Sequence, residues 1–332
     1  MEALANGSHP GGRPGRGPMV VGADIGGTKL CAVLTGADHD VAYRTWVEHG
    51  VSSSGELVDC VVAAVEDCRG VAGGVGGEVV AVGVSVAGWL SRDRQELIWG
   101  ANLGARDQEL GAELRRRLAL PVAIENDGNA SALAEALASG TNHCVVVLTL
   151  GTGVGGGVVI DGQPLLGAGG LAGELGHLCV AEGGSPCVCG GQGCLELFAS
   201  GRAIARAGHA VTSSEVVAAA EAGDPTAQGV LGTAGAAIGR AIALLVPVVD
   251  PDLVLLSGRL AQAAAPYLLP AARAALDEAR PLRHVSAPPR IELGRLGPEA
   301  GAMGAAELAL GILADLAPAP VAGRPTSVGE PR

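Results

Sequence analysis

The sequence predicts an α/β protein with two lobes, and three observations support this prediction. Segments with the composition of strands alternate with helical segments from about residue 19 to residue 315. A glycine-rich turn between two apolar strands occurs near the N-terminus, and a similar unit recurs about 125 residues later. The 332 residues are enough for about two domains. Two lobes built on the same strand–turn–strand unit would account for these observations.

Two kinds of pattern define the expected elements in chain order. Short runs rich in Val, Ile and Leu, bounded by Gly, Asp or Pro, predict strands. These runs are residues 19–24, 30–35, 41–47, 78–86, 121–127, 143–150, 154–160 and 252–258. Apolar residues at helical spacing predict helices. The helical segments are residues 56–68, 106–118, 128–139, an Ala-rich stretch before residue 252, and 299–313.

Charge and composition argue against several classes of protein. The formal net charge is -12, whereas a nucleic-acid surface requires clustered Lys and Arg, so no nucleic-acid partner is expected. No secretory signal is visible and no apolar stretch is expected to reach the length of a membrane span. We therefore expect a cytoplasmic protein that keeps its eight Cys reduced. Residues 1–18 and 316–332, rich in Gly and Pro, are expected to be disordered.

The first glycine-rich turn follows Asp24. Gly26 and Gly27 allow successive backbone N–H groups to face one point, an arrangement that binds phosphate. Thr28 adds a hydroxyl and Lys29 a positive charge, and the carboxylate of Asp24 suits hydrated Mg²⁺. A tight hairpin without a ligand is the alternative interpretation.

The second turn contains Gly151, Thr152 and Gly153 and continues through further glycines. It formally contains G-x-G-x-x-G, which indicates a dinucleotide site only where a helix follows. A strand is expected instead, so the Rossmann interpretation is rejected, and the sequence has no P-loop motif. Two such turns facing each other would hold a triphosphate between the lobes.

Three polar residues, Glu125, Asn126 and Asp127, stand where a predicted strand becomes a helix. The carboxyl ends of strands face the ligand crevice in open α/β sheets. An Asp there can accept a proton from a substrate hydroxyl that attacks phosphorus. The alternative is a helix cap worth about 1 kcal/mol, but one cap does not use all three polar groups.

A candidate metal site lies downstream, in the pattern H-x9-C-x-C-x4-C formed by His177, Cys187, Cys189 and Cys194. This mixed nitrogen and sulfur set suits Zn²⁺, and four protein ligands indicate a structural role. Cys179 is a rival ligand, and a disulfide and unligated thiols are the other interpretations.

Two carboxylates, Glu174 and Glu196, flank this loop. Each can accept two hydrogen bonds, which suits the vicinal hydroxyls of a sugar. A metal that fixes the loop would therefore stiffen a polyol-binding wall.

Together these motifs resemble the ROK family (repressors, open reading frames, kinases) of sugar kinases, most closely the bacterial ROK glucokinases. The resemblance spans roughly residues 19–315 and is strongest in GELGHLCVAEGGSPCVCGGQGCLE. DIGGTK, ENDGNA and LGTGVGGG match in order and spacing. Two departures are Ala87, where relatives usually carry Pro, and Arg259, which replaces a Gly.

The resemblance implies an actin-like, ribonuclease H-like ATPase fold with two lobes and a central cleft. Residues 19–130 would form the small N-terminal lobe, and residues 131–297 the larger C-terminal lobe with the zinc loop. Helix 298–315 would pack back on the first lobe. The resemblance also implies ATP, Mg²⁺, a structural Zn²⁺, and a homodimer or homotetramer.

The implied activity is an ATP-dependent glucokinase in which Asp127 is the general base for the 6-hydroxyl of glucose. The other contacts to the sugar would come from Gly88, Asn102, Asn126, Glu174, His177 and Glu196. The nucleotide and its phosphates would be held by Asp24, Gly26, Gly27, Thr28, Lys29, Gly151, Thr152, Gly153 and Gly258.

Two alternatives stay open at the level of function. One is a ROK kinase for another hexose, such as N-acetylmannosamine or fructose, and polyphosphate is a possible additional donor. The other is a kinase-like, sugar-sensing repressor, for which the roughly 18 residues before Met19 offer no DNA-binding domain.

Overall fold

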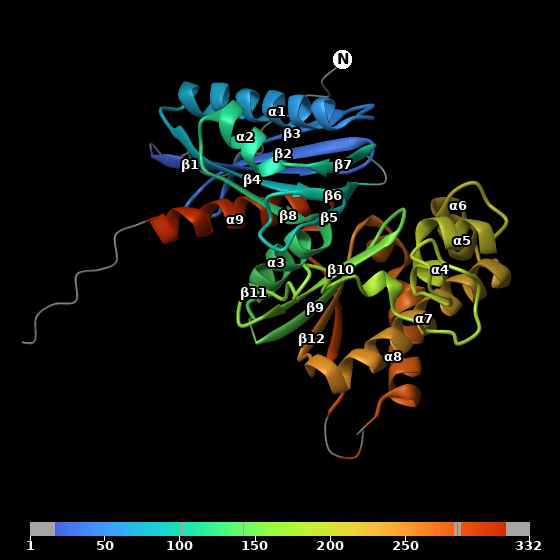
Figure 1. Ribbon diagram of the computed structural model, residues 1–332. Coiled ribbons are helices and arrows are strands. Elements are labelled where there is room, and N and C mark those ends of the chain that lie inside the picture. Colours follow the sequence, from blue (N-terminus) through green and yellow to red (C-terminus); the bar gives the residue numbers. More distant parts are fainter. Residues whose placement is uncertain (1–16, 101–102, 142, 282–283, 285–286, 317–332) are drawn as a thin grey trace, which may run out of the picture.

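The computed structural model describes residues 17–100, 103–141, 143–281, 284 and 287–316. Two five-stranded sheets form the body of the molecule, with helices on their faces (Figure 1). The α/β prediction is therefore confirmed. Most of the two terminal segments expected to be disordered lies outside the described residues, but Pro18 already begins the first strand and Leu316 ends the last helix.

The first sheet has the strand order β3-β2-β1-β4-β8. Its strands are β1 (Pro18–Ile25), β2 (Lys29–Gly36), β3 (Val41–Glu48), β4 (Glu78–Val86) and β8 (Val122–Asn126). The first three strands pair antiparallel, whereas β1, β4 and β8 run parallel. Helix α1 (Ser54–Gly74) and helix α2 (Leu110–Leu118) connect these strands and bury their apolar faces in the same core.

The second sheet repeats this topology, with the order β11-β10-β9-β12-β13. Its strands are β9 (Cys144–Leu150), β10 (Val154–Ile160), β11 (Gln163–Pro164), β12 (Leu253–Ser257) and β13 (Arg290–Leu293). Again three strands pair antiparallel, while β9, β12 and β13 run parallel. The repeated strand–turn–strand unit in the sequence thus corresponds to two sheets of the same topology.

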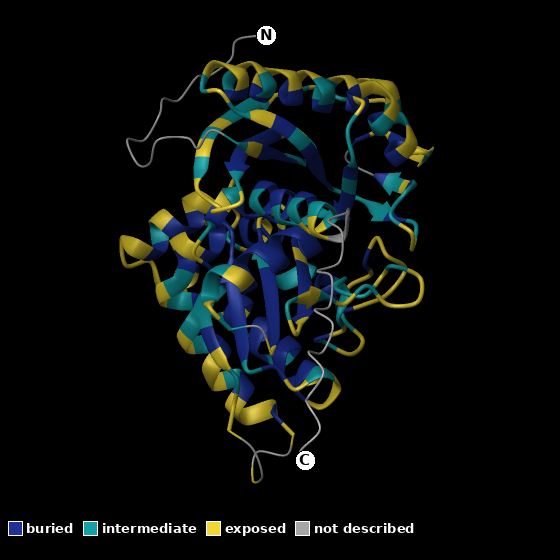
Figure 2. Ribbon diagram, turned by 90° about the vertical axis from the view of Figure 1, so that its left-hand side faces the viewer, coloured by how far each residue is buried: buried dark blue, intermediate teal, exposed yellow. Residues whose placement is uncertain are grey.

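Two helices lie between the sheets and are largely buried (Figure 2). Helix α3 (Asp127–Ser139) follows the last strand of the first sheet, and its Ala132 and Ala136 pack on the second sheet. Helix α9 (Ala300–Leu316) follows the last strand of the second sheet and packs on the first. The chain therefore crosses between the sheets twice. The expected lobe boundaries at residues 130 and 297 stay a prediction.

Small residues make this close packing possible. A Cβ added at Gly83 of β4 would overlap the carbonyl oxygen of Ala305 in α9. A Cβ at Gly304 of α9 would likewise overlap the carbonyl oxygen of Ala130 in α3. The abundance of Gly and Ala therefore lets helices and strands approach at backbone distance, which larger side chains would prevent.

The remaining elements surround this framework. The helices of the second half are α4 (Glu196–Ala199), α5 (Gly201–Ala207), α6 (Ser213–Glu221), α7 (Pro225–Val249) and α8 (Arg259–Ala279). Two short 3₁₀ helices are η1 (Leu175–His177) and η2 (Gly297–Glu299). A small separate sheet contains β5 (Trp89–Leu90), β6 (Leu97–Gly100) and β7 (Ala105–Gln108).

Two expectations were wrong. The predicted helix 106–118 begins only at Leu110, because the preceding residues form β7 and pair with β6. The expectation that no stretch reaches the length of a membrane span is wrong for α7, which is long and apolar enough by length and composition. However, 61% of its most apolar 18-residue window is buried, and its side chains pack in the core formed with the second sheet.

Candidate active site

Asp127 is the first residue of α3, where β8 ends. Asn126 caps the helix, since its Oδ1 accepts the backbone N–H groups of Gly128 (2.8 Å) and Asn129 (3.2 Å). Its Nδ2 donates to Oδ1 of Asp127 and to the carbonyl oxygen of Gly88, both at 3.0 Å. One side chain thus caps the helix, holds the carboxylate and connects both to the segment that follows β4.

The surroundings raise the pKa of Asp127 to about 7. Burial is the largest cause, the negative charges of Asp24 and Glu174 add to it, and the backbone N–H of Gly128 opposes it. The residue nevertheless keeps intermediate exposure to solvent. A carboxyl group with a pKa near neutrality is well suited to accept a proton.

Asp24 stands at the end of β1, and its Oδ1 accepts the hydroxyl of Ser85 at 2.6 Å. Burial raises the pKa of Asp24 to about 6, against the effect of this hydrogen bond. A Cβ at Gly301 of α9 would lie 2.5 Å from Cγ of Asp24. The negative charge of Asp24 also raises the pKa of Asp127, so the two carboxylates interact, and such a pair favours a nearby cation.

The first glycine-rich turn joins β1 to β2. The N–H of Gly26 donates to the carbonyl oxygen of Lys29 at 3.0 Å and closes the turn. Thr28 and Lys29 are exposed. Nζ of Lys29 lies 3.3 Å from Oε1 of Glu48, so the predicted contact of Lys29 with phosphate would require this exposed ion pair to open.

The second turn joins β9 to β10 and is held by hydrogen bonds from other parts of the chain. The N–H of Gly151 donates to the carbonyl oxygen of Gly153 at 3.1 Å, and the carbonyl of Gly151 accepts the N–H of Gly201 at 2.8 Å. Oε2 of Glu196 accepts the N–H of Val154 at 3.0 Å. A Cβ at Gly153 would lie 2.5 Å from that oxygen, so a larger residue would displace the carboxylate of Glu196.

Gly258 lies beside the same turn, immediately before α8. Its φ of 95° favours glycine, and a Cβ would lie 2.5 Å from the carbonyl oxygen of Leu150 at the end of β9. The exposed Thr152 accepts Nε of Arg202 at 3.3 Å through its carbonyl oxygen. The fold thus brings Gly258 next to the second turn although about 100 residues separate them in the sequence.

The two flanking glutamates lie near each other. Burial raises the pKa of Glu174, and the negative charge of Glu196 raises it further. His177 and a hydrogen bond from the side chain of Trp89 oppose this change. The structure therefore brings Glu174, Glu196, His177 and Trp89 close enough to interact, as a sugar-binding wall would require.

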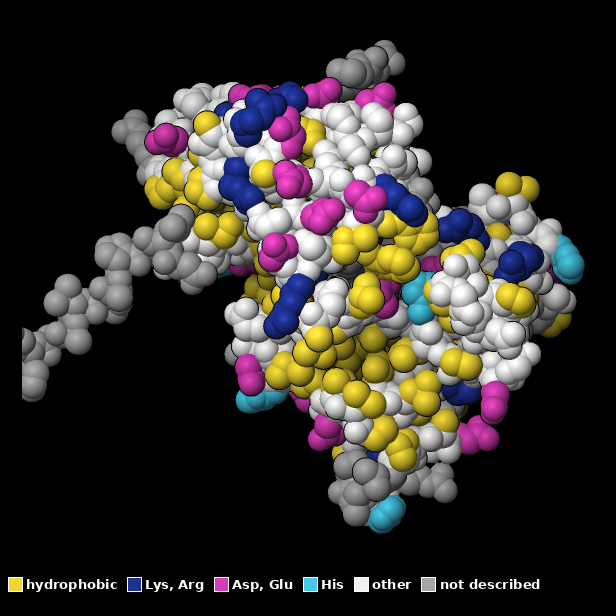
Figure 3. Space-filling view, in the orientation of Figure 1, with side chains coloured by type: hydrophobic (Ala, Val, Ile, Leu, Met, Phe, Trp, Pro, Cys, Tyr) yellow, Lys and Arg dark blue, Asp and Glu magenta, His cyan; other side chains and the backbone are white. Residues whose placement is uncertain are grey.

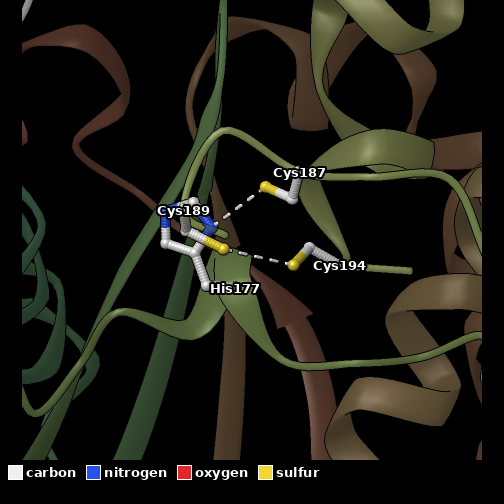
Figure 4. Close-up of side chains that lie close together, drawn as sticks. All are labelled: His177, Cys187, Cys189 and Cys194. Atoms are coloured by element: carbon white, nitrogen blue, oxygen red, sulfur yellow. Dashed lines mark hydrogen bonds between the residues drawn. The ribbon is translucent and has the colours of Figure 1, made fainter. Parts of the chain in front are cut away.

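His177, Cys187, Cys189 and Cys194 converge on one point (Figure 4). Sγ of Cys187 lies 3.6 Å from Nδ1 of His177, and Sγ of Cys189 lies 3.7 Å from Sγ of Cys194. All four ligand atoms lie within 4.8 Å of one another. In a tetrahedral site with Zn–S bonds of 2.3 Å, the sulfur atoms are about 3.8 Å apart, so these residues fit zinc.

The rival interpretations fit less well. Cys179 is exposed and does not belong to the cluster of four residues. The eight cysteines are free thiols, so none forms the disulfide considered from the sequence. Cys31, Cys68 and Cys144 are buried and do not belong to the cluster either.

Some site residues were not found, or cannot be placed. Asn102, an expected sugar contact, lies outside the described residues. Glu135 of α3 was missed, although it is buried and accepts the hydroxyl of Ser257 at 2.6 Å and the N–H of Arg295 at 2.7 Å. It fixes α3 against the end of β12. The available signal was a charged residue in an Ala-rich helix, two turns after Asp127.

Comparison with known proteins identifies the family. The model of the ROK family matches residues 20–312. Glucokinase from Halalkalibacterium halodurans is 31% identical over 313 residues, which cover 86% of this chain and 92% of that protein. Glucokinase from Streptomyces coelicolor is 38% identical over 190 residues, but the match spans only 58% of its length and 57% of this chain. Kanosamine kinase from Amycolatopsis mediterranei is 32% identical and covers 88% of this chain and 96% of its own.

Solved structures show the same relationship. A ROK hexokinase from Thermus thermophilus superposes with a TM-score of 0.78 at 33% identity, covering 90% of this chain and all of that one. A ROK glucokinase from Streptomyces griseus, in complex with glucose and AMPPNP, gives 0.75 at 30% identity, with 88% and 99% covered. The predicted actin-like, ribonuclease H-like ATPase fold is thereby confirmed. Since the family model matches almost the whole of the described chain, the chain belongs to the ROK family.

Proposed function

We propose that this chain is an ATP-dependent glucokinase that transfers the γ-phosphoryl group to the 6-hydroxyl of glucose. Its relatives support a hexokinase-type phosphotransferase. The observation that carries the proposal is the position of Asp127 at the start of α3, with a pKa near 7 and beside both Asp24 and Glu174.

Asp127 is the general base. Its Oδ1 is held by Asn126 and by the N–H of Gly128, each at 3.0 Å, which leaves Oδ2 to accept the proton of the attacking hydroxyl. Phosphoryl transfer depends mostly on positioning and on charge neutralisation, so a fixed carboxylate is what the reaction requires of the protein.

The sugar is held on one wall by Glu174, Glu196 and His177. The two carboxylates accept hydrogen bonds from its hydroxyls. His177 faces Cys187 through Nδ1, so its other nitrogen is available to a hydroxyl or to a neighbouring carboxylate. Gly88 and Asn126, which share a hydrogen bond of 3.0 Å, would complete the contacts to the sugar.

The nucleotide lies between the two glycine-rich turns. Backbone N–H groups at Gly27 and Thr28, and at Thr152 and Gly153, would contact the phosphates, with Gly258 beside the nucleoside, since the N–H groups of Gly26 and Gly151 close the two turns. Asp24 would hold hydrated Mg²⁺, which supplies charge neutralisation at the phosphate oxygens when bound.

A structural Zn²⁺ would be held by His177, Cys187, Cys189 and Cys194. The metal supplies no step of the reaction, because four protein ligands close its coordination. Its effect is to fix the loop that carries Glu174 at one end and Glu196 at the other. The use of ATP fits the cytoplasmic location expected from the sequence, and the homodimer or homotetramer stays a prediction.

A kinase for another hexose is the second candidate, because one of the relatives of similar identity is a kanosamine kinase. The residues of the sugar wall recognise hydroxyl groups in general and do not separate these acceptors. A sugar-sensing repressor is less well supported, since Asp127 and both turns are retained. On the face shown in Figure 3, Lys and Arg side chains lie scattered rather than gathered in a basic surface.

A coupled assay of ADP release with a panel of hexoses tests the proposal. The panel contains glucose, mannose, fructose, kanosamine, N-acetylglucosamine and N-acetylmannosamine, each with ATP, and product formation with polyphosphate is measured separately. We expect the highest kcat/KM with glucose and ATP. A higher value with an amino or N-acetylamino sugar would replace glucose as the acceptor, and no turnover with any hexose would reject the kinase.

A further inference from the structure

A buried ion pair lies behind the base Asp127. Nε of Arg94 donates to Oε2 of Glu125 at 3.0 Å, and the two side chains are only 11% and 4% exposed. Burying two charges costs several kcal/mol per ion unless hydrogen bonds and close geometry offset the loss of water. The location of such a pair next to a reactive carboxylate therefore calls for a physical explanation.

Arg94 occupies an unfavourable backbone conformation. It lies in the connection between β5 and β6 with a φ of 58°, a region that favours glycine. Its N–H donates to the carbonyl oxygen of Ser91 at 2.9 Å, and its Nη1 reaches the same oxygen at 3.3 Å. Glycine would adopt this backbone conformation with less strain, so we infer that the contacts of the Arg94 side chain offset the strain.

Glu125 in turn forms hydrogen bonds with Asn126 and Asn129 at the start of α3. Its Oε1 accepts the N–H of Asn126 at 2.8 Å and Nδ2 of Asn129 at 3.1 Å. Asn126 in turn donates to Asp127. A chain of hydrogen bonds therefore runs from Arg94 through Glu125 and Asn126 to the carboxylate of Asp127.

Arg94 also touches the segment that leads to Glu174. A Cβ at Gly170 would lie 2.7 Å from Nη1 of Arg94 and 3.2 Å from the carbonyl oxygen of Leu90. Within the described part of the chain, Nη2 of Arg94 is buried without a hydrogen-bond partner. The guanidinium group therefore directs its charge at Glu125 and packs against the loop that carries the sugar wall.

The charged groups around Asp127 are otherwise acidic. Asp24 faces it from β1 and Glu174 from the segment before η1, and both raise its pKa. Glu125 comes from β8, two residues away, and its charge is neutralised by Arg94. Without Arg94, a third carboxylate would stand uncompensated beside the base and would disfavour its ionised form.

We propose that Arg94 is a positioning residue for phosphoryl transfer, which neutralises Glu125 and thereby keeps Asn126 and Asp127 oriented toward the hydroxyl of the hexose. This inference rests on the proposed function. It assigns to Arg94 a role through Glu125, without contact to the substrate.

The test compares Arg94→Met, Glu125→Gln, the double variant and Arg94→Lys. The pH dependence of kcat and the KM values for glucose and ATP are measured, after thermal denaturation has shown which variants fold. We expect Arg94→Met to lower kcat about tenfold to hundredfold, with KM for ATP within about twofold. The acid limb of its pH profile should move up by about half to one pH unit, because the uncompensated negative charge of Glu125 would raise the pKa of Asp127.

The double variant decides between positioning and simple stability. It removes both charges, so its acid limb should return to the wild-type pH, and it should recover part of the kcat lost in Arg94→Met. Arg117→Met, which breaks the exposed 2.9 Å pair with Asp59, is the control and should leave kcat within about twofold. A loss of kcat without movement of the acid limb would reduce Arg94 to a structural residue and overturn the proposal.

Arg94→Lys covers the case in which Arg94→Met does not fold. The retained charge predicts an acid limb at the wild-type pH with a reduced kcat, because lysine cannot reproduce the guanidinium geometry. An unchanged kcat, or a displaced limb, would overturn the proposal. An inactive wild type would refute the proposed kinase itself, whereas an active wild type with unaffected variants would refute only the role of Arg94.

Discussion

The two sheets share one topology, yet only one of them leads into the carboxylate proposed as the general base. The last strand of the first sheet continues through Asn126 and Asp127 into α3. The last strand of the second sheet continues through η2 into α9, which begins with Ala300 and Gly301. Gly301 brings no polar side chain and instead touches Asp24. The repeated architecture thus places two helix starts near Asp24, and only the start of α3 carries polar side chains suited to the proposed chemistry.

The two glycine-rich turns differ in a similar way. The turn after β1 is closed by its own backbone, and Lys29 forms an exposed ion pair. The turn after β9 is additionally held by Glu196 and by the start of α5. The second turn is therefore fixed by the same loop that carries the candidate zinc ligands, whereas the first is held by its own backbone and by the N–H of His49, which donates to the carbonyl oxygen of Thr28 at 3.0 Å.

Loss of the metal should have the largest effect on stability, and only a substitution at the candidate zinc site should cause it. Cys194→Ala should reduce bound zinc from about one per chain to nearly none and lower Tm by about 5–10 °C, because the loop loses its cross-link. Cys68→Ala, an equally buried thiol in the first lobe, is the matched control and should retain zinc. Metal analysis and thermal denaturation measure both. If the wild-type protein without zinc had the same Tm as with zinc, the metal would not stabilise this fold.

The packing of the crossing helices offers the next contrast. Gly83→Ala places a methyl group on the backbone of α9, whereas Gly157→Ala meets the Cβ of Ala132 in α3 at 2.6 Å. Overpacking costs about 1–3 kcal/mol and more where backbone must move, so Gly83→Ala should destabilise the fold by about 3 kcal/mol and Gly157→Ala by about 1 kcal/mol. Urea denaturation gives both values, and the reverse order would contradict the closer packing of α9.

The smallest expected effect is a pH dependence of stability. Because the folded state raises the pKa of Asp127 to about 7, the folded protein binds this proton more tightly than the unfolded chain. The resulting stabilisation is present at low pH and is lost as the pH rises toward 7. Asp127→Asn cannot ionise, so its stability relative to wild type should be greater at pH 8 than at pH 5 by about 1–2 kcal/mol, given the partial exposure. Equal differences at the two pH values in urea denaturation would mean that Asp127 titrates normally.

The strands and the order of motifs were predictable because they depend on local patterns. Apolar runs gave β4 (Glu78–Val86) with its ends correct, and the repeated turn predicted two related sheets. The helix expected at 106–118 failed at its start because pairing with β6, a tertiary contact, outweighs helical spacing. A local sequence pattern cannot reveal a competing tertiary contact of this kind.

The site was predictable only where its residues form a compact motif. His177 and the three cysteines lie in one loop, so their spacing indicated a metal. Glu135 and Arg94 act across long sequence separations, on Ser257 and Glu125, and carry no motif of their own. Their roles follow from the close approach of α3 to β12 and of the β5–β6 connection to β8, which depends on the assembled fold.

The most direct test of the central claim is the turnover of Asp127→Ala with glucose and ATP, together with its affinity for glucose by calorimetry. Loss of a general base costs about 10²- to 10⁴-fold, so kcat should fall by that factor while the dissociation constant for glucose stays within about tenfold. The sugar wall of Glu174, Glu196 and His177 remains in place in this variant. A kcat within about tenfold of wild type would show that Asp127 is not the base.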